Sequence, residues 1–139
     1  MCTGVNEQKK EWLLRYLRTK ASEKVVLDEM EELRASYVLP SPTIDDMPHG
    51  DGNGSDLSDY AVRYDQLYHK LIRAYTSRME IYDEIVRAVN AMQASEAEKC
   101  VLRYRYILGY SWEKIAVTMN YTYRHVTRLH GQALGNLKV

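Results

Sequence analysis

Two long segments of the chain place apolar and aromatic residues at helical spacing. Residues 6–38 contain no Pro or Gly and carry a rough apolar stripe, formed by Leu13, Leu17, Ala21, Leu27, Met30, Leu33 and Tyr37. Residues 57–93 keep an a/d heptad pattern through Ala61, Tyr64, Tyr68, Leu71, Tyr75, Arg78, Tyr82, Ile85, Val89 and Met92. Two long helices with one apolar face each are expected to pair, so we predict an antiparallel helical hairpin of 6–38 against 57–93.

The segment between these helices, residues 39–56, is predicted to be a loop. Three Pro and three Gly fall within it, and both residue types interrupt regular structure. Asp51, Asn53 and Ser55 have the spacing of a calcium loop, but its sixth position is Asp56 instead of Gly. Its twelfth position, Val62, replaces the usual Glu. We therefore favour a solvated loop in which Ser55, Asp56 or Ser58 caps the following helix.

A boundary is expected at Ala94–Ser95, where three shorter helices begin. Ser95 and Glu98 match a capping box that starts a helix over 95–108, which Gly109 would end. Ser111 is placed to cap a helix over 112–119, and Thr122 to cap a last helix through about residue 134. The predicted inner positions are Cys100, Val101, Tyr104, Ile107, Leu108, Trp112, Ile115, Ala116, Met119, Val126, Leu129, Ala133 and Leu134. The fold class is therefore all-α, with a hairpin domain at 1–94 and a three-helix domain at 95–139.

Charge divides along the same line, although the whole chain is formally neutral. Residues 1–94 hold 12 Lys and Arg against 16 Asp and Glu, whereas residues 95–139 hold 7 against 3. No Asp or Glu occurs within 114–139. A cationic segment without acidic residues indicates an anionic partner, of which nucleic acid is the commonest.

Short helices joined by tight turns in a cationic segment are typical of a DNA-binding helix-turn-helix. In that interpretation helix 112–119 lies across the phosphate backbone and helix 122–134 enters the major groove of double-stranded DNA. Arg can read guanine edges, and Tyr, Thr and His can bond to bases or phosphates. The groove-facing residues would be Thr122, Tyr123, Arg124, His125, Thr127 and Arg128, with Gln132 beyond them. A plain three-helix packing unit is the alternative that the spacing alone leaves open.

Residues 95–138 resemble region 4 of sigma-70 factors. The positions that match that family's pattern are Val101, Leu102, Arg105, Tyr106, Ser111, Glu113, Ile115, Ala116, Val126, Ala133 and Leu134. The resemblance implies binding to promoter DNA at the −35 region and contact with RNA polymerase. It assigns the recognition contacts to Thr122, Tyr123, Arg124, His125, Thr127 and Arg128. The regions with which a full sigma factor melts a promoter are not matched.

Nearly the whole chain is similar to a phage and prophage family of unknown function, related to the ArpU and RinA-type activators of phage late genes. The matching features are a two-helix first part, a loop like SPTIDDMPHGDGNGSD, and a segment of the form RYxxGxSWEKIAxxMNYTxRxVxRLHGxAL. This resemblance implies transcriptional regulation in a phage or prophage.

Other kinds of site are not indicated by the sequence. The four His do not show metal-ligand spacing, no nucleophile lies in a catalytic motif, and no P-loop is present, so we expect no enzyme activity, metal or cofactor. Cys2 and Cys100 do not form a disulfide framework, which suits reduced thiols in the cytoplasm. No apolar run is long enough for a membrane span.

The sequence thus predicts a DNA-binding transcriptional regulator in which the helical hairpin supplies a homodimer or partner surface. Two alternatives stay open. The chain could be a small-terminase-like DNA packaging factor, which would assemble into a ring of many subunits. It could also be a protein-interaction module whose helix-turn-helix binds another protein and no DNA.

Overall fold

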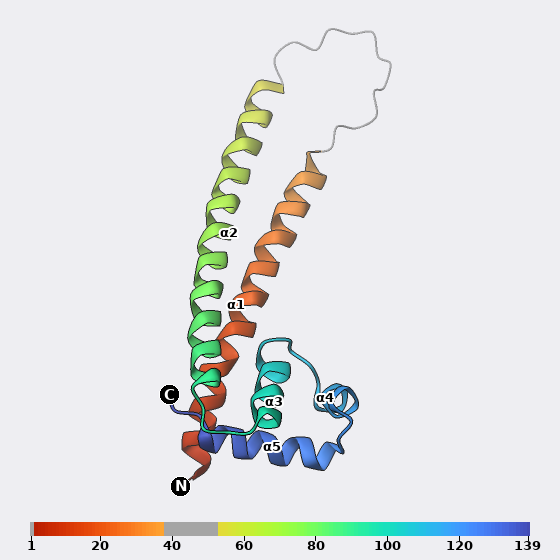
Figure 1. Ribbon diagram of the computed structural model, residues 1–139. Coiled ribbons are helices and arrows are strands. Elements are labelled where there is room, and N and C mark those ends of the chain that lie inside the picture. Colours follow the sequence, from red (N-terminus) through yellow and green to blue (C-terminus); the bar gives the residue numbers. More distant parts are fainter. Residues whose placement is uncertain (1, 38–52) are drawn as a thin grey trace. The chain divides into compact units, whose positions relative to one another are not determined.

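The computed structural model describes residues 2–37 and 53–139, and all regular structure within them is helical. The helices are α1 (Cys2–Ser36), α2 (Asn53–Asn90), α3 (Glu96–Tyr106), α4 (Trp112–Met119) and α5 (Tyr123–Asn136), as Figure 1 shows. The predicted all-α class is confirmed. Among the described residues, no helix combines the length and the apolarity that crossing a membrane requires.

The predicted bounds of the two long helices need correction. Helix α1 spans Cys2–Ser36 instead of 6–38, and α2 spans Asn53–Asn90 instead of 57–93, so residues 53–56 of the predicted loop are helical. Ser55, Asp56 and Ser58 consequently lie inside α2 and do not precede it. The last proline is Pro48, and a single Gly54 in a long helix costs only about 1 kcal/mol, so nothing stops α2 from starting early. The rest of the expected loop, with Asp51 of the calcium-like pattern, lies outside the described residues.

The helices group into two compact units. The larger unit combines the residues up to Lys20 with Ser77–Val139, and the smaller unit is Ala21–Thr76. The larger unit thus contains residues on both sides of the domain boundary expected at residue 94, and that boundary stays a prediction.

The larger unit has two buried clusters. One brings the start of α1 and the end of α2 onto α3 and α5, and its centre is Leu13, Tyr16, Ile85, Val89, Met92, Leu102, Tyr106, Ala133, Leu134 and Leu137. The other is formed by α3, α4 and α5 alone, from Val101, Ile115, Ala116, Val126 and Leu129. All the inner positions predicted for α5 are buried, whereas Leu108, predicted to face inward, is 51% exposed.

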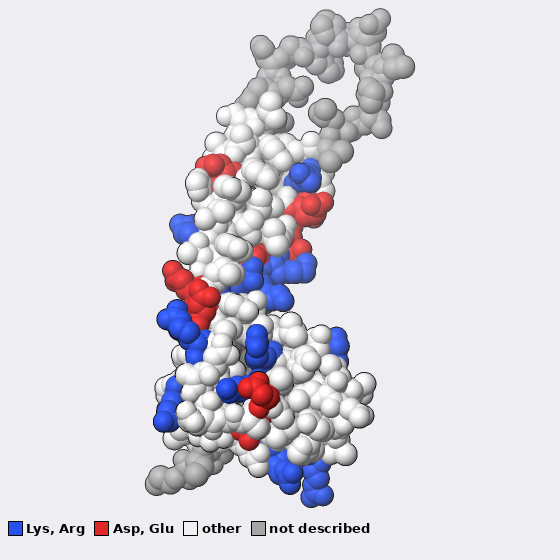
Figure 2. Space-filling view, viewed as in Figure 1, with Lys and Arg blue, Asp and Glu red and all other residues white. Residues whose placement is uncertain are grey.

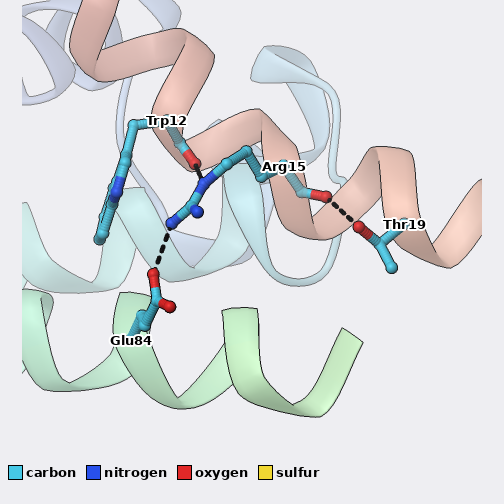
Figure 3. Close-up of polar contacts among 4 residues, drawn as sticks. All are labelled: Trp12, Arg15, Thr19 and Glu84. Carbon is cyan, nitrogen blue, oxygen red and sulfur yellow. Dashed lines mark hydrogen bonds and ion pairs between the residues drawn. The ribbon is translucent and has the colours of Figure 1, made fainter. Parts of the chain in front are cut away.

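Polar contacts join α1 to its neighbours in the larger unit. The Arg15 guanidinium bonds the Glu84 carboxylate of α2 at 2.7 Å, and its Nε donates to the Trp12 carbonyl one turn earlier (Figure 3). The guanidinium of Arg78, the one charged residue of the predicted seam, donates to Tyr16 Oη at 3.2 Å. Lys9 Nζ donates to the Leu134 carbonyl of α5 at 2.7 Å.

In the smaller unit, the segments of α1 and α2 run antiparallel beside each other (Figure 1). The ring centroids of Tyr37 and Tyr60 are 4.9 Å apart, and Leu33 and Leu67 line one shallow groove. Val26 is the buried residue of α1 here, whereas Ala21 and Leu27 of the predicted stripe are exposed.

The predicted heptad seam of α2 is only partly buried. Ile85, Val89 and Met92 are core residues in the larger unit, but four members of the seam are exposed in the smaller unit, namely Ala61, Tyr64, Tyr68 and Tyr75. A second stripe of α2 is half-buried there instead, formed by Tyr60, Leu67, Leu71 and Ala74. The two stripes are adjacent on the helix, and α1 covers the second one.

Candidate nucleic-acid interface

A short turn, residues 120–122, joins α4 to α5. Asn120 ends α4 in the left-handed conformation, with φ 59° and ψ 43°, and Tyr121 donates its backbone N–H to the Ala116 carbonyl at 2.9 Å. Asn tolerates this conformation better than other residues with a Cβ, because its short polar side chain can bond locally. The turn therefore ends one helix and starts the next within three residues, which fixes the direction of α5 relative to α4.

Side-chain hydroxyls cap all three short helices, as the sequence predicts. Ser95 Oγ accepts from the Glu98 N–H, Ser111 Oγ from the Lys114 N–H, and Thr122 Oγ1 from the His125 N–H at 3.1 Å. The Glu98 carboxylate does not complete a reciprocal bond within the capping box but accepts from Asn136 Nδ2. The cap at Thr122 sets the first residue of α5 and so decides which side chains of that helix face outward.

The cluster beneath α4 and α5 is small and fully closed. Val101, Ile115 and Val126 have no exposed surface, and Ala116 and Leu129 are nearly buried. Each helix thus contributes at least one side chain to the same contact, and the inner face of α5 is fixed by Val126 and Leu129. With these positions inside, the residues between them must face away from the cluster.

Aromatic and cationic side chains form contacts between α4 and its neighbours α3 and α5. The Trp112 ring has the Arg105 guanidinium 4.4 Å from its centroid and meets the His130 ring at 4.6 Å. Arg105 also donates to the Tyr110 carbonyl at 3.0 Å, before the cap of α4. The start of α4 is thus held in place by one side chain of α3 and one of α5.

The six residues predicted to contact DNA all lie on α5 or at its cap, and none of them is buried. Thr122, Tyr123, Arg124 and Arg128 are exposed, whereas His125 and Thr127 are partly covered. The exposed fraction of Tyr123 is 50%. Gln132, which we placed at the end of this surface, is also exposed.

The two arginines of this surface are not neutralised by the chain itself. Within the described residues, neither Arg124 nor Arg128 pairs with a carboxylate, and Arg128 Nη2 lies 3.2 Å from His125 Nδ1. The Tyr121 ring meets His125 edge-on, with centroids 4.7 Å apart. His125 is thereby held between a ring and a guanidinium, which orients Arg128 along the helix.

In Figure 2, Lys and Arg side chains lie at the surface over the first turns of α5. Glu113, at the start of α4, is the last acidic residue of the sequence, so α5 presents cations without neighbouring carboxylates on its own turns. Two of the seven cations of residues 95–139, Arg124 and Arg128, therefore lie on the exposed face of α5.

Two further residues beside this surface were not among the predicted recognition contacts. Lys114 is exposed on α4, with its ammonium 4.0 Å from the centroid of the Tyr110 ring, and it adds a third cation to the region. Tyr121, directly before the cap of α5, is 40% exposed. For Lys114 the signal was present, because it lies one residue from buried Ile115 and hence off the inner face.

His130 was not predicted as a core residue, because it was weighed only for metal-ligand spacing, which it lacks. It is 8% exposed, and burial, with Lys10 and Arg105 nearby, lowers its pKa to about 4. Its position four residues after Val126 puts it on the inner face, which the helical period could have shown. Among the described residues, no group of His, Cys, Asp and Glu is arranged to hold a metal ion.

Comparisons of the chain with protein-family models, curated proteins and solved structures give no match. The similarity to sigma-70 region 4 and to phage activators therefore stays a prediction from the motifs.

Proposed function

We propose that this chain is a DNA-binding transcriptional regulator that inserts α5 into the major groove of double-stranded DNA. The observation that carries the proposal is the outer face of α5, where Arg124 and Arg128 are exposed without carboxylate partners among the described residues. Val126 and Leu129 are buried on the opposite face, which anchors α5 to the domain and supports a fixed orientation of its outer face.

The dimensions of the two partners suit this arrangement. An α-helix with its side chains is about 10–12 Å across, and the major groove of B-DNA is about 12 Å wide. Arg124 and Arg128 are four residues apart and share a face, so both can reach base edges or phosphates from one groove. Tyr123 and Thr127 lie on the same side and add a phenol and a hydroxyl.

The start of α5 and the neighbouring α4 would contact the phosphate backbone. Only the His125 N–H is satisfied by the Thr122 cap, so the first N–H groups of α5 are oriented for a phosphate oxygen. Lys114 supplies a cation from α4. The resemblance to sigma-70 region 4 suggests a promoter as the target and RNA polymerase as a further partner, in a phage or prophage setting and in the cytoplasm.

The test is selection of bound duplexes from a random DNA library, followed by binding titrations of the best duplex at several salt concentrations. We expect enrichment of a sequence, and a loss of affinity of at least about tenfold for Arg124→Ala/Arg128→Ala, since a good base contact contributes about 1–3 kcal/mol. If both arginines contact phosphates instead, the slope of log K against log salt should fall by about 2.

A matched control removes the same charge elsewhere. Arg63→Ala/Arg73→Ala changes two exposed arginines of α2 and should leave affinity and salt slope nearly unchanged. No enrichment with the wild-type chain, or equal losses in both double variants, would overturn the proposal. Helix content measured by circular dichroism checks that each variant is folded.

A further inference from the structure

The smaller unit exposes a continuous apolar and aromatic stripe along α2. Its members are Leu57 (68% exposed), Tyr64 (37%), Tyr68 (46%), Ile72 (45%) and Tyr75 (48%), together with Ala61. These residues follow one another at three or four positions, so they share one face of the helix. The stripe lies beside the face that contacts α1, and neither the proposed DNA contacts nor the core uses it.

The spacing of this stripe is symmetric about Tyr68. From Ala61 to Tyr75 the intervals are three, four, four and three residues. A two-fold interface requires such self-complementarity, because every contact between two residues occurs twice in opposite directions. A stripe that fits an unrelated helix has no need of this symmetry.

We infer that the stripe binds the same stripe of a second copy of this chain, with the two α2 helices antiparallel and the two-fold axis at Tyr68. About that axis, Ala61 of one copy lies opposite Tyr75 of the other. Tyr64 lies opposite Ile72 in the same way, and the two Tyr68 rings meet at the axis.

The shape of the surface agrees with this register. A shallow hollow surrounds Ala61, the smallest residue of the stripe, and is lined by Leu57, Tyr60, Ala61, Tyr64, Asp65 and Tyr68. In the antiparallel register, this hollow receives Tyr75 of the second copy. A large side chain entering a hole among residues of the facing helix is how helices interdigitate.

The polar residues beside the stripe, Asp65 and His69, are also consistent with the antiparallel register. Asp65 and His69 flank the same edge of the stripe and lie 3.4 Å apart within one chain. Because an antiparallel two-fold axis brings like edges together, Asp65 of one copy comes near His69 of the other. The pair forms twice across the interface, each time between a carboxylate and an imidazole.

The inference is tested by the oligomeric state of full-length chains in analytical ultracentrifugation. Wild type is expected to form dimers, and Tyr68→Glu and Tyr68→Lys are each expected to weaken dimerisation by at least about 30-fold, because like charges meet at the axis. An equimolar mixture of the two variants should recover the dimer as a mixed species. The control Val25→Glu alters a 54% exposed valine of α1 and should leave dimerisation unchanged.

The register has its own test in a background where Cys2 and Cys100 are changed to Ser. Chains with Ala61→Cys, mixed with chains carrying Tyr75→Cys, should give mixed disulfide-linked dimers under mild oxidation. A monomeric wild type, dimerisation unaffected by Tyr68→Glu, or preferential linkage of Ala61→Cys chains to one another would overturn the inference. None of these outcomes depends on whether the chain binds DNA.

Discussion

Tyr106 Oη and His130 Nε2 lie 2.7 Å apart in the interior of the larger unit, where α3 packs on α5. Burial raises the pKa of Tyr106 to about 12 and lowers that of His130 to about 4, so both groups are neutral near pH 7. Depending on its tautomer, the neutral imidazole either accepts the phenol O–H at Nε2 or donates its Nε2–H to the phenol oxygen. The pair is therefore a buried hydrogen bond between two neutral groups.

The burial of His130 predicts that the protein loses stability in mild acid. In the unfolded chain His130 titrates near pH 6.5, whereas in the folded chain its pKa is about 4. Between these values the unfolded state binds more protons, so the free energy of unfolding falls as pH drops from 6.5 towards 4. We expect His130 to contribute on the order of 2–3 kcal/mol to this change, measured by urea unfolding at several pH values.

The control for the pH effect is His130→Gln, which lacks a titrating group. This variant should be less stable at pH 7, because it disturbs the contact with Tyr106, but its stability should change less between pH 6.5 and pH 4. Parallel pH profiles for wild type and His130→Gln would contradict the assignment.

Two glycines of the larger unit should respond to alanine in opposite directions. A Cβ at Gly131, on the exposed side of α5, would meet no atom within 4 Å. Gly131→Ala should therefore stabilise the fold by about 0.5–1 kcal/mol, through the higher helix propensity of Ala. Gly109 has φ +71°, where a Cβ is strained, so Gly109→Ala should destabilise by about 1–2 kcal/mol. Thermal unfolding of both variants measures the difference, and a shift of the same sign in both would contradict it.

Much of the three-helix part could be predicted from local sequence. Ser95, Ser111 and Thr122 cap the helices as expected, because capping depends on the hydroxyl and on backbone groups within three residues. Val126, Leu129 and Leu134 are buried as the helical period predicts. The six proposed contact residues follow from these two results, since the capped start and the inner face together define the outer face of α5.

The burial of α2 could not be predicted in the same way. Its stripe through Tyr64 and Tyr68 and its stripe through Leu67 and Leu71 are both apolar and both have helical spacing. Which stripe α1 covers depends on packing between residues distant in the sequence, and no local pattern decides between them. For His130 the helical period does indicate the inner face, but its environment there depends on Tyr106 and Trp112, which are distant in the sequence.

The cluster beneath α4 and α5 predicts a sharp contrast between two neighbouring aliphatic residues of α4. Ile115 has no exposed surface, whereas Val117 is 83% exposed. Ile115→Ala should destabilise the protein by about 2–5 kcal/mol, because it leaves a cavity in a small cluster. Val117→Ala should stay within about 0.5 kcal/mol of wild type. Chemical denaturation of both variants checks the contrast, and a small effect of Ile115→Ala would show that the cluster is not close-packed.

The cap at Thr122 connects stability to the proposed DNA contacts. Thr122→Ala removes the acceptor for the His125 N–H and should cost about 0.5–2 kcal/mol, whereas Thr122→Ser keeps the hydroxyl and should cost less. Because the cap fixes the first turn of α5, DNA affinity should fall for Ala and be retained for Ser. The readouts are thermal unfolding and binding to the selected duplex. Equal behaviour of the two variants would contradict this role.

The bond from Lys9 to the Leu134 carbonyl, and the cluster that unites Leu13 and Tyr16 with Ala133 and Leu137, have a consequence for biosynthesis. During translation the apolar face of the first helix is made long before Ala133, Leu134 and Leu137 of the same cluster, so the larger unit cannot close until these three residues have been synthesised. A chain stalled at residue 120 lacks Ala133, Leu134 and Leu137, so the cluster around Leu13 and Tyr16 is incomplete and its apolar surface is open to chaperones.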